Sequence, residues 1–352
     1  MKQLSVLIDP VYQKPQEFSR YERFWFRFIN DKRDLPFVHL LTWIHLSVIP
    51  LGMLLFFTSI LPGAWWWAVY AVWFFIGHIR LRGPFGLMLH NITHRRFFKK
   101  KYDWLNKYVI WFVCPFFGHT PETYFVHHVG MHHEENNMDD DTSSTLPYQR
   151  DSVIDFFKYY LNFLFLGFKE TFMYLFNRKK KKYYLRLTYG EGAFFLLCIG
   201  MCFINLQAAL WVLIIPFLLS RLVMMLGNWT QHAFVDPNDP ENLYRNCYTC
   251  INTSYNKKCW NDGYHLMHHL RPGAHYTEMP ALFVKEKDTL VKERSLVFDG
   301  IHYLHLFFYL MTKRYDKIAD NLVNINDAFS SREEAITILK QRTAKFHNRR
   351  AA

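Results

Sequence analysis

Charged side chains are missing from two long stretches of this sequence. No Asp, Glu, Lys or Arg occurs between Leu35 and Ile79 or between Gly192 and Ser220. A helix needs about 20 mainly apolar residues to cross a bilayer core, so each stretch with its flanks has room for two spans. Pro62-Gly63 and Asn205 to Gln207 mark the turns. We therefore expect four membrane-spanning helices in two hairpins, and we exclude a disordered chain.

Motifs that bind common redox or hydrolytic cofactors are also missing. The sequence has no glycine-rich dinucleotide motif, no four-cysteine iron–sulfur spacing and no His-Pro-Gly-Gly of a cytochrome b5 domain. Among its 6 cysteines, Cys247 and Cys250 have zinc-site spacing, but no second pair follows, so we expect reduced thiols. Neither the His-Glu-x-x-His of zinc proteases nor the Glu-x-x-His of soluble di-iron bundles occurs. Electrons for a redox reaction must then come from a separate protein.

Basic residues are concentrated in three places outside the apolar stretches. The net charge is +12, and Lys and Arg cluster in the first 34 residues, from Arg95 to Lys101 and from Arg178 to Lys182, whereas the hairpin tips are uncharged. By the positive-inside rule, both termini of this multi-pass protein are expected in the cytoplasm. The bacterial inner membrane and the endoplasmic reticulum both fit. The basic face would attract acidic proteins, and no nucleic-acid partner is expected.

These features predict the organisation of the chain. Shorter apolar stretches are expected as helices lying in the membrane interface: Trp104–Phe117, Phe156–Phe176 and Leu296–Met311. Ser331 and Glu334 have the spacing of a capping box, which predicts a basic helix after Ser331. The expected regions are a cytoplasmic N-terminal segment (1–34), a membrane and catalytic domain (35–280) with spans at about 37–60, 64–82, 189–205 and 208–228, and a cytoplasmic helical C-terminal region (281–352).

Histidine is abundant, and half of the 18 histidines fall into four short patterns. The patterns are His90-Asn-Ile-Thr-His94, His128-Val-Gly-Met-His132-His133, Asn228-Trp-Thr-Gln-His232 and His265-Leu-Met-His268-His269. Residues three and four apart share one face of an α-helix, so each pattern presents its side chains in one direction. Imidazole is the commonest metal ligand, and nine are more than one ion needs, so two metal ions are expected. Ligand type alone leaves iron, copper, nickel and zinc open.

The four patterns, set after one hairpin and after the other, resemble the membrane fatty acid desaturase superfamily from about Leu35 to Pro280. The resemblance implies an all-α integral membrane fold with four spans and a cytoplasmic helical cap that holds a di-iron centre. The implied cofactors are two iron ions, with O2 as co-substrate. The implied partners are the bilayer, a lipid or fatty acyl substrate, and a separate electron donor of the ferredoxin or cytochrome b5 type.

The resemblance also assigns roles to individual residues. The expected metal ligands are His90, His94, His128, His132, His133, His232, His265, His268 and His269. Asn228 is expected to reach the metal through water, and His127 to lie behind the ligands or at the surface. Other histidines are expected to be packed or hydrogen-bonded: His39, His45, His78, His119, His275, His302, His305 and His347. The run Asp139–Asp141 is expected to form a solvated loop.

The expected activity is that of a membrane-bound non-haem di-iron oxidoreductase, and desaturation of a fatty acyl chain is the favoured reaction. Alkane hydroxylases and alkene-forming fatty acid decarboxylases resemble this chain through the same boxes, so hydroxylation and decarboxylation remain alternatives. A histidine-rich metal transporter is a distant alternative, which the lack of acidic residues in both apolar stretches disfavours. Chain length, head group and oxidised position stay open.

Overall fold

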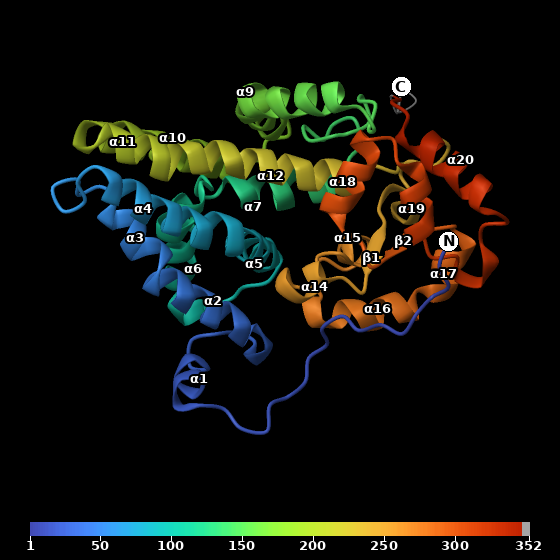
Figure 1. Ribbon diagram of the computed structural model, residues 1–352, viewed down its shortest axis with the longest axis horizontal. Coiled ribbons are helices and arrows are strands. Elements are labelled where there is room, and N and C mark those ends of the chain that lie inside the picture. Colours follow the sequence, from blue (N-terminus) through green and yellow to red (C-terminus); the bar gives the residue numbers. More distant parts are fainter. Residues whose placement is uncertain (347–352) are drawn as a thin grey trace. The chain divides into compact units, whose positions relative to one another are not determined.

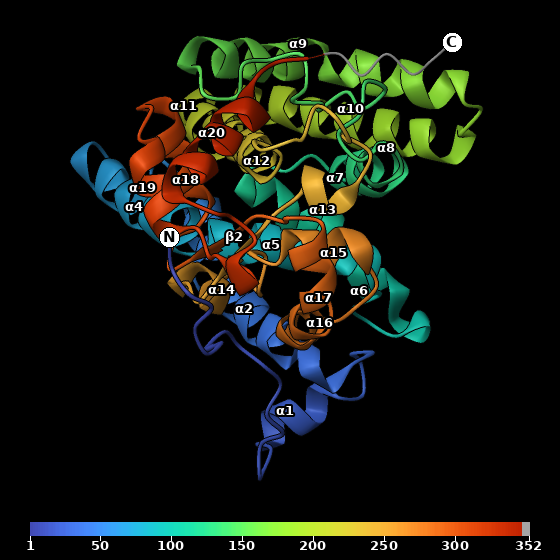
Figure 2. The ribbon, with the colours of Figure 1, turned by 90° about the vertical axis from the view of Figure 1, so that its right-hand side faces the viewer.

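The computed structural model describes residues 1–346, so His347 lies outside the described residues. The chain is mostly helical and divides into two compact units (Figures 1 and 2). Unit 1 comprises Met1–Val11, Val129–Tyr174 and the described residues from Val223 onward. Unit 2 comprises Tyr12–His128 and Leu175–Leu222. Three elements continue from one unit into the next along the chain: a π-helical turn (His128–His132), α9 (Val153–Asn177) and α12 (Ile215–Gln231).

Unit 2 contains the apolar helices. Its elements are α1 (Arg20–Trp25), α2 (Leu35–Leu46), α3 (Val48–Leu54), α4 (Ala64–Phe74), α5 (Arg82–His94), α6 (Asp103–Tyr108), α7 (Thr123–His127), α10 (Lys181–Ile204) and α11 (Leu206–Ala208), with π-helical stretches at Phe75–Arg80, Val109–Val113 and Ala209–Ile214. Short 3-10 turns occupy Lys32–Asp34, Lys100–Tyr102 and Cys114–Phe117.

Three helical segments of the described chain are long and apolar enough to cross a membrane: Lys32–Leu54, Lys181–Ile204 and Leu206–Gln231. They match three of the four expected spans. The remaining expected span, about 64–82, is also helical, with α4 of 11 residues continuing into a π-helical stretch of 6. That segment is not among the three, so four spans, the hairpins and a cytoplasmic cap remain predictions.

Polar contacts and one glycine fix the turn that leads into α7. Glu191 on α10 accepts hydrogen bonds from the hydroxyls of Thr120 and Thr123, each at 2.8 Å, and pairs with Arg221. Gly190, the preceding residue, faces the carbonyl oxygen of Pro121; a Cβ built there would lie 1.8 Å from that oxygen. Only glycine allows this approach, and the contact sets where α7 begins.

Unit 1 is built from short helices around a small sheet. Its elements are α8 (His133–Glu135), most of α9, part of α12, α13 (Leu243–Asn246), β1 (Thr249–Ile251), α14 (Ser254–Lys258), α15 (His265–Leu270), α16 (Met279–Lys285), α17 (Lys287–Lys292), β2 (Val297–Asp299), α18 (Tyr303–Met311), α19 (Tyr315–Asn321) and α20 (Arg332–Thr343). Short 3-10 turns occupy Tyr276–Glu278 and Ile325–Asp327.

The sheet corrects the all-α expectation. β1 and β2 pair in parallel with Cys250 opposite Phe298, and Figure 1 shows them side by side. The stretch Leu296–Met311 was expected to be one helix, and this is wrong: β2 precedes α18 within it. Each strand has only three residues, and β1 and the first two residues of β2 are buried, so neither shows the alternating pattern by which a strand is recognised.

Both ends of the described chain belong to unit 1. Lys2 pairs with Val323, and its ammonium donates to the Asp299 carbonyl at 2.7 Å, which places the N-terminus beside β2 (Figures 1 and 2). The predicted helix after Ser331 is confirmed as α20, with the Ser331 hydroxyl accepting from the Glu334 amide at 3.1 Å. The N-terminal segment is therefore tied to the core of unit 1.

Candidate metal centre

Unit 2 brings together its three box histidines. His90 and His94 lie on α5, and His128 follows α7. The ring centroids are 4.5 Å apart for His90 and His128, 5.0 Å for His94 and His128, and 5.8 Å for His90 and His94. All three pairs meet edge to face, and Tyr124 stacks on His128 at 5.4 Å. One helix face and one helix end thus present three imidazoles to a common point.

Unit 1 brings together the other six box histidines: His132, His133, His232, His265, His268 and His269. The His232 ring lies 5.2 Å from that of His132, 5.0 Å from that of His265 and 5.3 Å from that of His269. His133 lies 4.8 Å from His268 and 4.6 Å from His269. Within this unit, residues from the π-helical turn, from α8, from the end of α12 and from α15 therefore converge.

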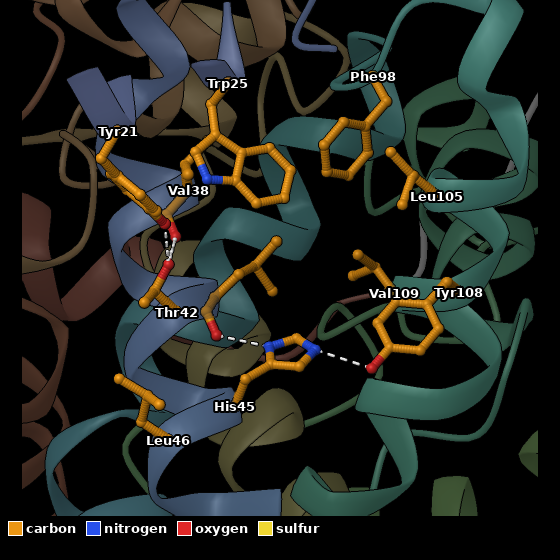
Figure 3. Close-up of a pocket in the computed structure, with 11 residues that line it drawn as sticks. Tyr21, Trp25, Val38, Thr42, His45, Leu46, Phe98, Leu105, Tyr108 and Val109 are labelled. Carbon is orange, nitrogen blue, oxygen red and sulfur yellow. Dashed lines mark hydrogen bonds between the residues drawn. The ribbon is translucent and has the colours of Figure 1, made fainter. Parts of the chain in front are cut away.

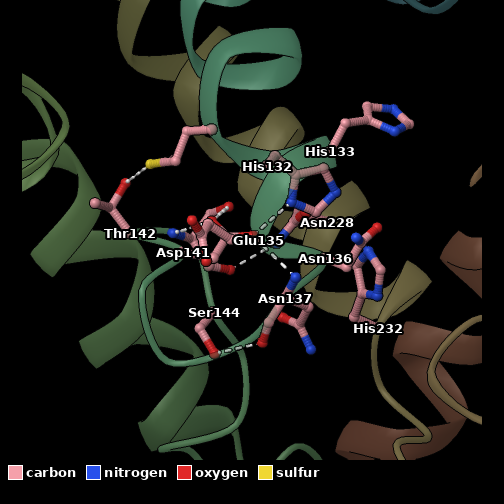
Figure 4. Close-up of polar contacts among 12 residues, drawn as sticks. His132, His133, Glu135, Asn136, Asn137, Asp141, Thr142, Ser144, Asn228 and His232 are labelled. Atoms are coloured by element: carbon pink, nitrogen blue, oxygen red, sulfur yellow. Dashed lines mark hydrogen bonds and ion pairs between the residues drawn. The ribbon is translucent and has the colours of Figure 1, made fainter. Parts of the chain in front are cut away.

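The carboxylate of Asp141 orients His132 (Figure 4). The His132 Nδ1–H donates to Asp141 Oδ2 at 2.7 Å, so the other ring nitrogen, Nε2, is the unprotonated one. Asp141 is 3% exposed, and it also accepts from the amides of Asn137 at 3.1 Å and Ser143 at 2.8 Å and from the Ser143 hydroxyl at 2.7 Å. The solvated-loop expectation holds for Asp139 and Asp140, which are exposed. It is wrong for Asp141, because four donors replace the water around that carboxylate.

Two asparagines orient two further imidazoles in the same way. Asn136 Oδ1 lies 3.1 Å from His269 Nδ1, and Asn246 Oδ1 lies 3.1 Å from His232 Nδ1. The Asn246 amide nitrogen in turn donates to the Asn136 carbonyl at 2.7 Å. Asn136 has the left-handed backbone (φ 48°) that ends α8, a conformation asparagine tolerates well. Three of the six rings therefore direct Nε2 away from an oxygen partner.

The Nε2 atoms face one another at distances that fit a metal ion. They are 3.2 Å apart for His232 and His265, 3.1 Å for His265 and His269, and 2.9 Å for His133 and His268. Two nitrogens bound at about 2.1 Å to one ion lie about 3 Å apart when the bonds meet at a right angle. Because His232 and His269 keep their protons on Nδ1, their Nε2 lone pairs point at the same region, and a cation there would stabilise them.

Burial keeps these rings neutral. Burial, followed by the nearby His132, lowers the pKa of His232 to about 3. Burial and then the neighbouring His265 lower the pKa of His269 well below its usual range. A neutral imidazole is the form that ligates metals, so the donor set fits a transition metal.

The second histidine pattern departs from the expected α-helix. His128–His132 forms a π-helical turn, a feature often found at functional sites, and α8 follows it directly. Figure 4 shows the His132 and His133 side chains pointing in different directions, His132 toward Asp141. The two adjacent histidines therefore reach different neighbours.

Asn228 and His127 occupy defined positions. The Asn228 amide nitrogen donates to the Ser143 carbonyl at 2.8 Å and to the Tyr159 hydroxyl at 2.7 Å. Tyr159 itself donates to the Ser143 carbonyl at 3.0 Å, which locks the amide in unit 1. His127, at the end of α7, is buried, so the surface alternative for this residue is wrong.

Cys247 lies beside the cluster. Its sulfur is 3.8 Å from His232 Nδ1. One ligand atom from each of His232, Cys247, His265 and His269 lies within 4.8 Å of the others, so this buried group could hold a metal ion. The 6 cysteines are free thiols, as predicted. Spacing did not identify Asp141, Asn136 or Asn246. Asn136 and Asp141 follow the second histidine pattern closely, whereas Asn246 lies 14 residues after His232 and carried no signal.

Comparison with known proteins gives one match. A family model described as Fatty acid desaturase matches residues 64–300. No curated protein and no solved structure matches the chain. The matched segment contains all four histidine patterns and more than half of the 352 residues. The chain therefore belongs to the fatty acid desaturase family, which makes it an oxidoreductase that acts on lipid.

Proposed function

We propose that this protein is a membrane-bound di-iron oxidase that introduces a double bond into a fatty acyl chain. The observation that carries the proposal is the ring arrangement in unit 1, where His232, His265 and His269 turn their Nε2 atoms toward one another. Family membership adds the substrate class. Bound iron would supply the O2 chemistry that removes hydrogen from a methylene carbon.

The proposed reaction balances with an external reductant. A –CH2–CH2– unit, one O2, two electrons and two protons give –CH=CH– and two waters. Each carbon loses one hydrogen, and the new π bond joins them. The electrons come from a separate ferredoxin or cytochrome b5, because the chain has no redox motif other than the histidines. We place both termini and the basic segments on the cytoplasmic side, where an acidic donor would dock.

The chain's own residues hold and orient the metal ligands. The proposed ligands are His90, His94, His128, His132, His133, His232, His265, His268 and His269. Asp141 fixes the tautomer of His132, and Asn246 and Asn136 do the same for His232 and His269. The amide nitrogen of Asn228 is held by its partners, which leaves its carbonyl oxygen to orient a water.

A cavity in unit 2 supports an acyl substrate with an anionic head. Its volume is about 540 Å³, and it runs along α5 beside the first histidine pattern. Leu89 and Cys114 form buried apolar walls, whereas Arg96, Lys107 and Lys182 are exposed. Within residues 1–346, none of these three cations forms an ion pair, so they are available to a carboxylate or phosphate. An amphiphile would place its chain inside and its head at the rim.

Product analysis tests the proposal and separates it from its alternatives. The full chain, purified with bound iron, is supplied with a fatty acid, O2, and a ferredoxin or cytochrome b5 with its reductase, and the products are identified by mass spectrometry. We expect an unsaturated acid of the original length, formed only with O2 and donor. A hydroxy acid, or a 1-alkene one carbon shorter, would replace desaturation by the corresponding reaction. Loss of all iron to a mild chelator, together with no product, would favour metal transport.

A further inference from the structure

The first segment of the chain belongs to unit 1, and we call it the N-terminal strap (Met1–Val11). It precedes every helix and strand of the chain. Leu4 and Leu7 pack against a hydrophobic cluster that contains Leu266 and Met267 of α15. The strap therefore contacts the same core as the short helix that carries the last histidine pattern.

Asp9 is a buried acidic residue of the strap, 6% exposed. Its carboxylate accepts three hydrogen bonds, from the Asn252 backbone amide at 2.7 Å, the Tyr264 hydroxyl at 2.7 Å and the Asn256 side-chain amide at 3.0 Å. A carboxylate offers only acceptor sites, so it takes all three donors at once. Tyr264 lies 255 residues after Asp9, so this contact joins distant parts of the sequence.

Tyr264 connects the strap to the histidines. It immediately precedes His265 and is the N-cap residue of α15, where its side chain makes no capping hydrogen bond. Its backbone carbonyl accepts from the His268 amide at 3.0 Å, while its hydroxyl reaches Asp9. Because α15 has 6 residues and a helix this short is not stable by itself in water, contacts at its ends and in its core set its direction.

The strap also holds the loop before α15. Asn256, which donates to Asp9, accepts from the Gly263 amide at 3.0 Å. A Cβ built at Gly263 would lie 2.4 Å from Asn256 Oδ1, so the loop packs closely on this asparagine. The side-chain amide of Asn261 donates to the Pro10 carbonyl at 2.7 Å. Asp9 and Pro10 together therefore fasten the loop that leads into the helix.

The position of α15 matters because its histidine nitrogens lie close to nitrogens from other elements. His265 Nε2 is 3.2 Å from His232 Nε2, and His268 Nε2 is 2.9 Å from His133 Nε2. Bonds between protein ligands and a metal ion keep their lengths to within about 0.2 Å. A shift of α15 larger than this would therefore change which nitrogens reach a common ion.

We propose that Asp9 is a positioning residue for the metal centre: through Tyr264 it holds the start of α15, and so it directs the three histidines of that helix toward the bound ion. The inference rests on the proposed function, which takes those histidines as metal ligands. Asp9 acts on the rings through intervening residues. Its removal should therefore alter the arrangement of the ligands around the ion while leaving the ligands themselves in the chain.

Cobalt(II) binding by the purified full chain tests this role independently of catalysis. Nitrogen ligands bind Co²⁺ more tightly than Fe²⁺, and the visible absorption bands of bound Co²⁺ depend on the arrangement of its ligands. We expect Asp9→Asn and Tyr264→Phe each to shift these bands and to weaken Co²⁺ binding about 10-fold, at the lower end of the range for hydrogen-bond partners of ligands. The bands are compared per bound cobalt, so a smaller folded fraction alone does not change them.

Each variant has a matched control. Tyr108→Phe also removes one hydroxyl, which donates at 2.7 Å to Nε2 of His45, a histidine of unit 2 outside the four patterns (Figure 3). Asp288→Asn removes a carboxylate from an exposed position on α17 in unit 1. Both controls should keep the parent bands and the parent Co²⁺ affinity. Tyr264→Phe leaves the buried ring in place, so it reports on the contact even where Asp9→Asn disturbs folding.

The outcomes separate this role from the proposed function. Unchanged bands and affinity in Tyr264→Phe, or parent bands with only less folded protein in Asp9→Asn, would overturn the positioning role even if the parent desaturates a fatty acid. Absence of Co²⁺ binding by the parent would overturn it as well. A parent that forms no unsaturated product, while both variants shift the bands, would contradict desaturation and support the role of Asp9.

Discussion

The two units position their histidines by different means. In unit 2, His90 and His94 are one helical turn apart on α5, and His128 meets them edge to face under the Tyr124 ring. In unit 1, the Nδ1 atoms of His132, His232 and His269 are held by side-chain oxygens from loops and helix ends.

Residue spacing alone specifies a site only where its side chains lie on one helix. A repeat of four residues on one helix is enough to aim two rings in one direction. His232, at the end of α12, and His269, on α15, need hydrogen-bond partners from elsewhere in the chain to face one point. Neither helix fixes the tautomer of its own histidine. The following predictions test this difference, beginning with the largest effect.

Removing a proposed ligand from either unit should abolish catalysis. We expect His265→Ala and His128→Ala each to lower turnover by more than about 100-fold, beyond the range for the hydrogen-bond partners of ligands. Iron per protein is measured by mass spectrometry and helix content by circular dichroism, and helix content should stay unchanged. If either variant kept native iron and full activity, its unit would not contribute to the metal site.

Gly190→Ala should displace α7 and with it the support of His128. The new Cβ would lie 1.8 Å from the Pro121 carbonyl oxygen, so we expect a loss of about 3 kcal/mol in the free energy of unfolding, at the upper end for overpacking. Gly192→Ala is the matched control, because no heavy atom lies within 4 Å of its Cβ. Thermal unfolding of both variants in detergent measures their stability relative to the parent. Equal stability of the two variants would contradict the close packing of α10 on this turn.

Asp141→Asn should impair unit 1 without unfolding it. The asparagine cannot reproduce a charged acceptor for His132, so we expect iron affinity or turnover to fall about 10- to 100-fold. Asp139→Asn removes the same charge from an exposed neighbour and should change neither. Titration of both variants with iron measures the affinity, and a turnover assay measures the activity. A matching loss in Asp139→Asn would point to loop charge rather than to ring orientation.

The smallest effect should come from the start of α20, far along the chain from the histidine boxes. Hydrogen bonds from Ser330 and then Arg294 lower the pKa of Glu334 to about 2, from an ordinary value of 4.5. A depressed folded-state pKa adds stability above the ordinary value, and that stability is lost as pH falls from about 4.5 toward 2. Glu334→Gln should therefore be slightly less stable than the parent at pH 6, with a smaller difference at pH 3. Urea unfolding at both pH values checks this, and a constant difference would exclude the ionised carboxylate as its cause.

Much of the local structure was predictable because it depends on neighbours in sequence. Runs without charge predicted four spans, of which three are helices able to cross a membrane, and the Ser331 cap predicted where α20 begins. Features that depend on distant residues were not predictable in this way. β1 finds its partner β2 far along the chain, and Asp141 is buried only because His132 and the Asn137 and Ser143 amides surround it.

The number and spacing of the histidines and the runs without charge can be read from the sequence, and they indicate the family. Those are properties of residue type and helical period, which act over one or two turns. Only the folded chain settles which nitrogen of His132, His232 and His269 is protonated, because that choice depends on Asp141, Asn246 and Asn136 lying beside these rings. Packing also brings the Cys247 sulfur to 3.8 Å from His232 Nδ1, a contact that spacing does not predict.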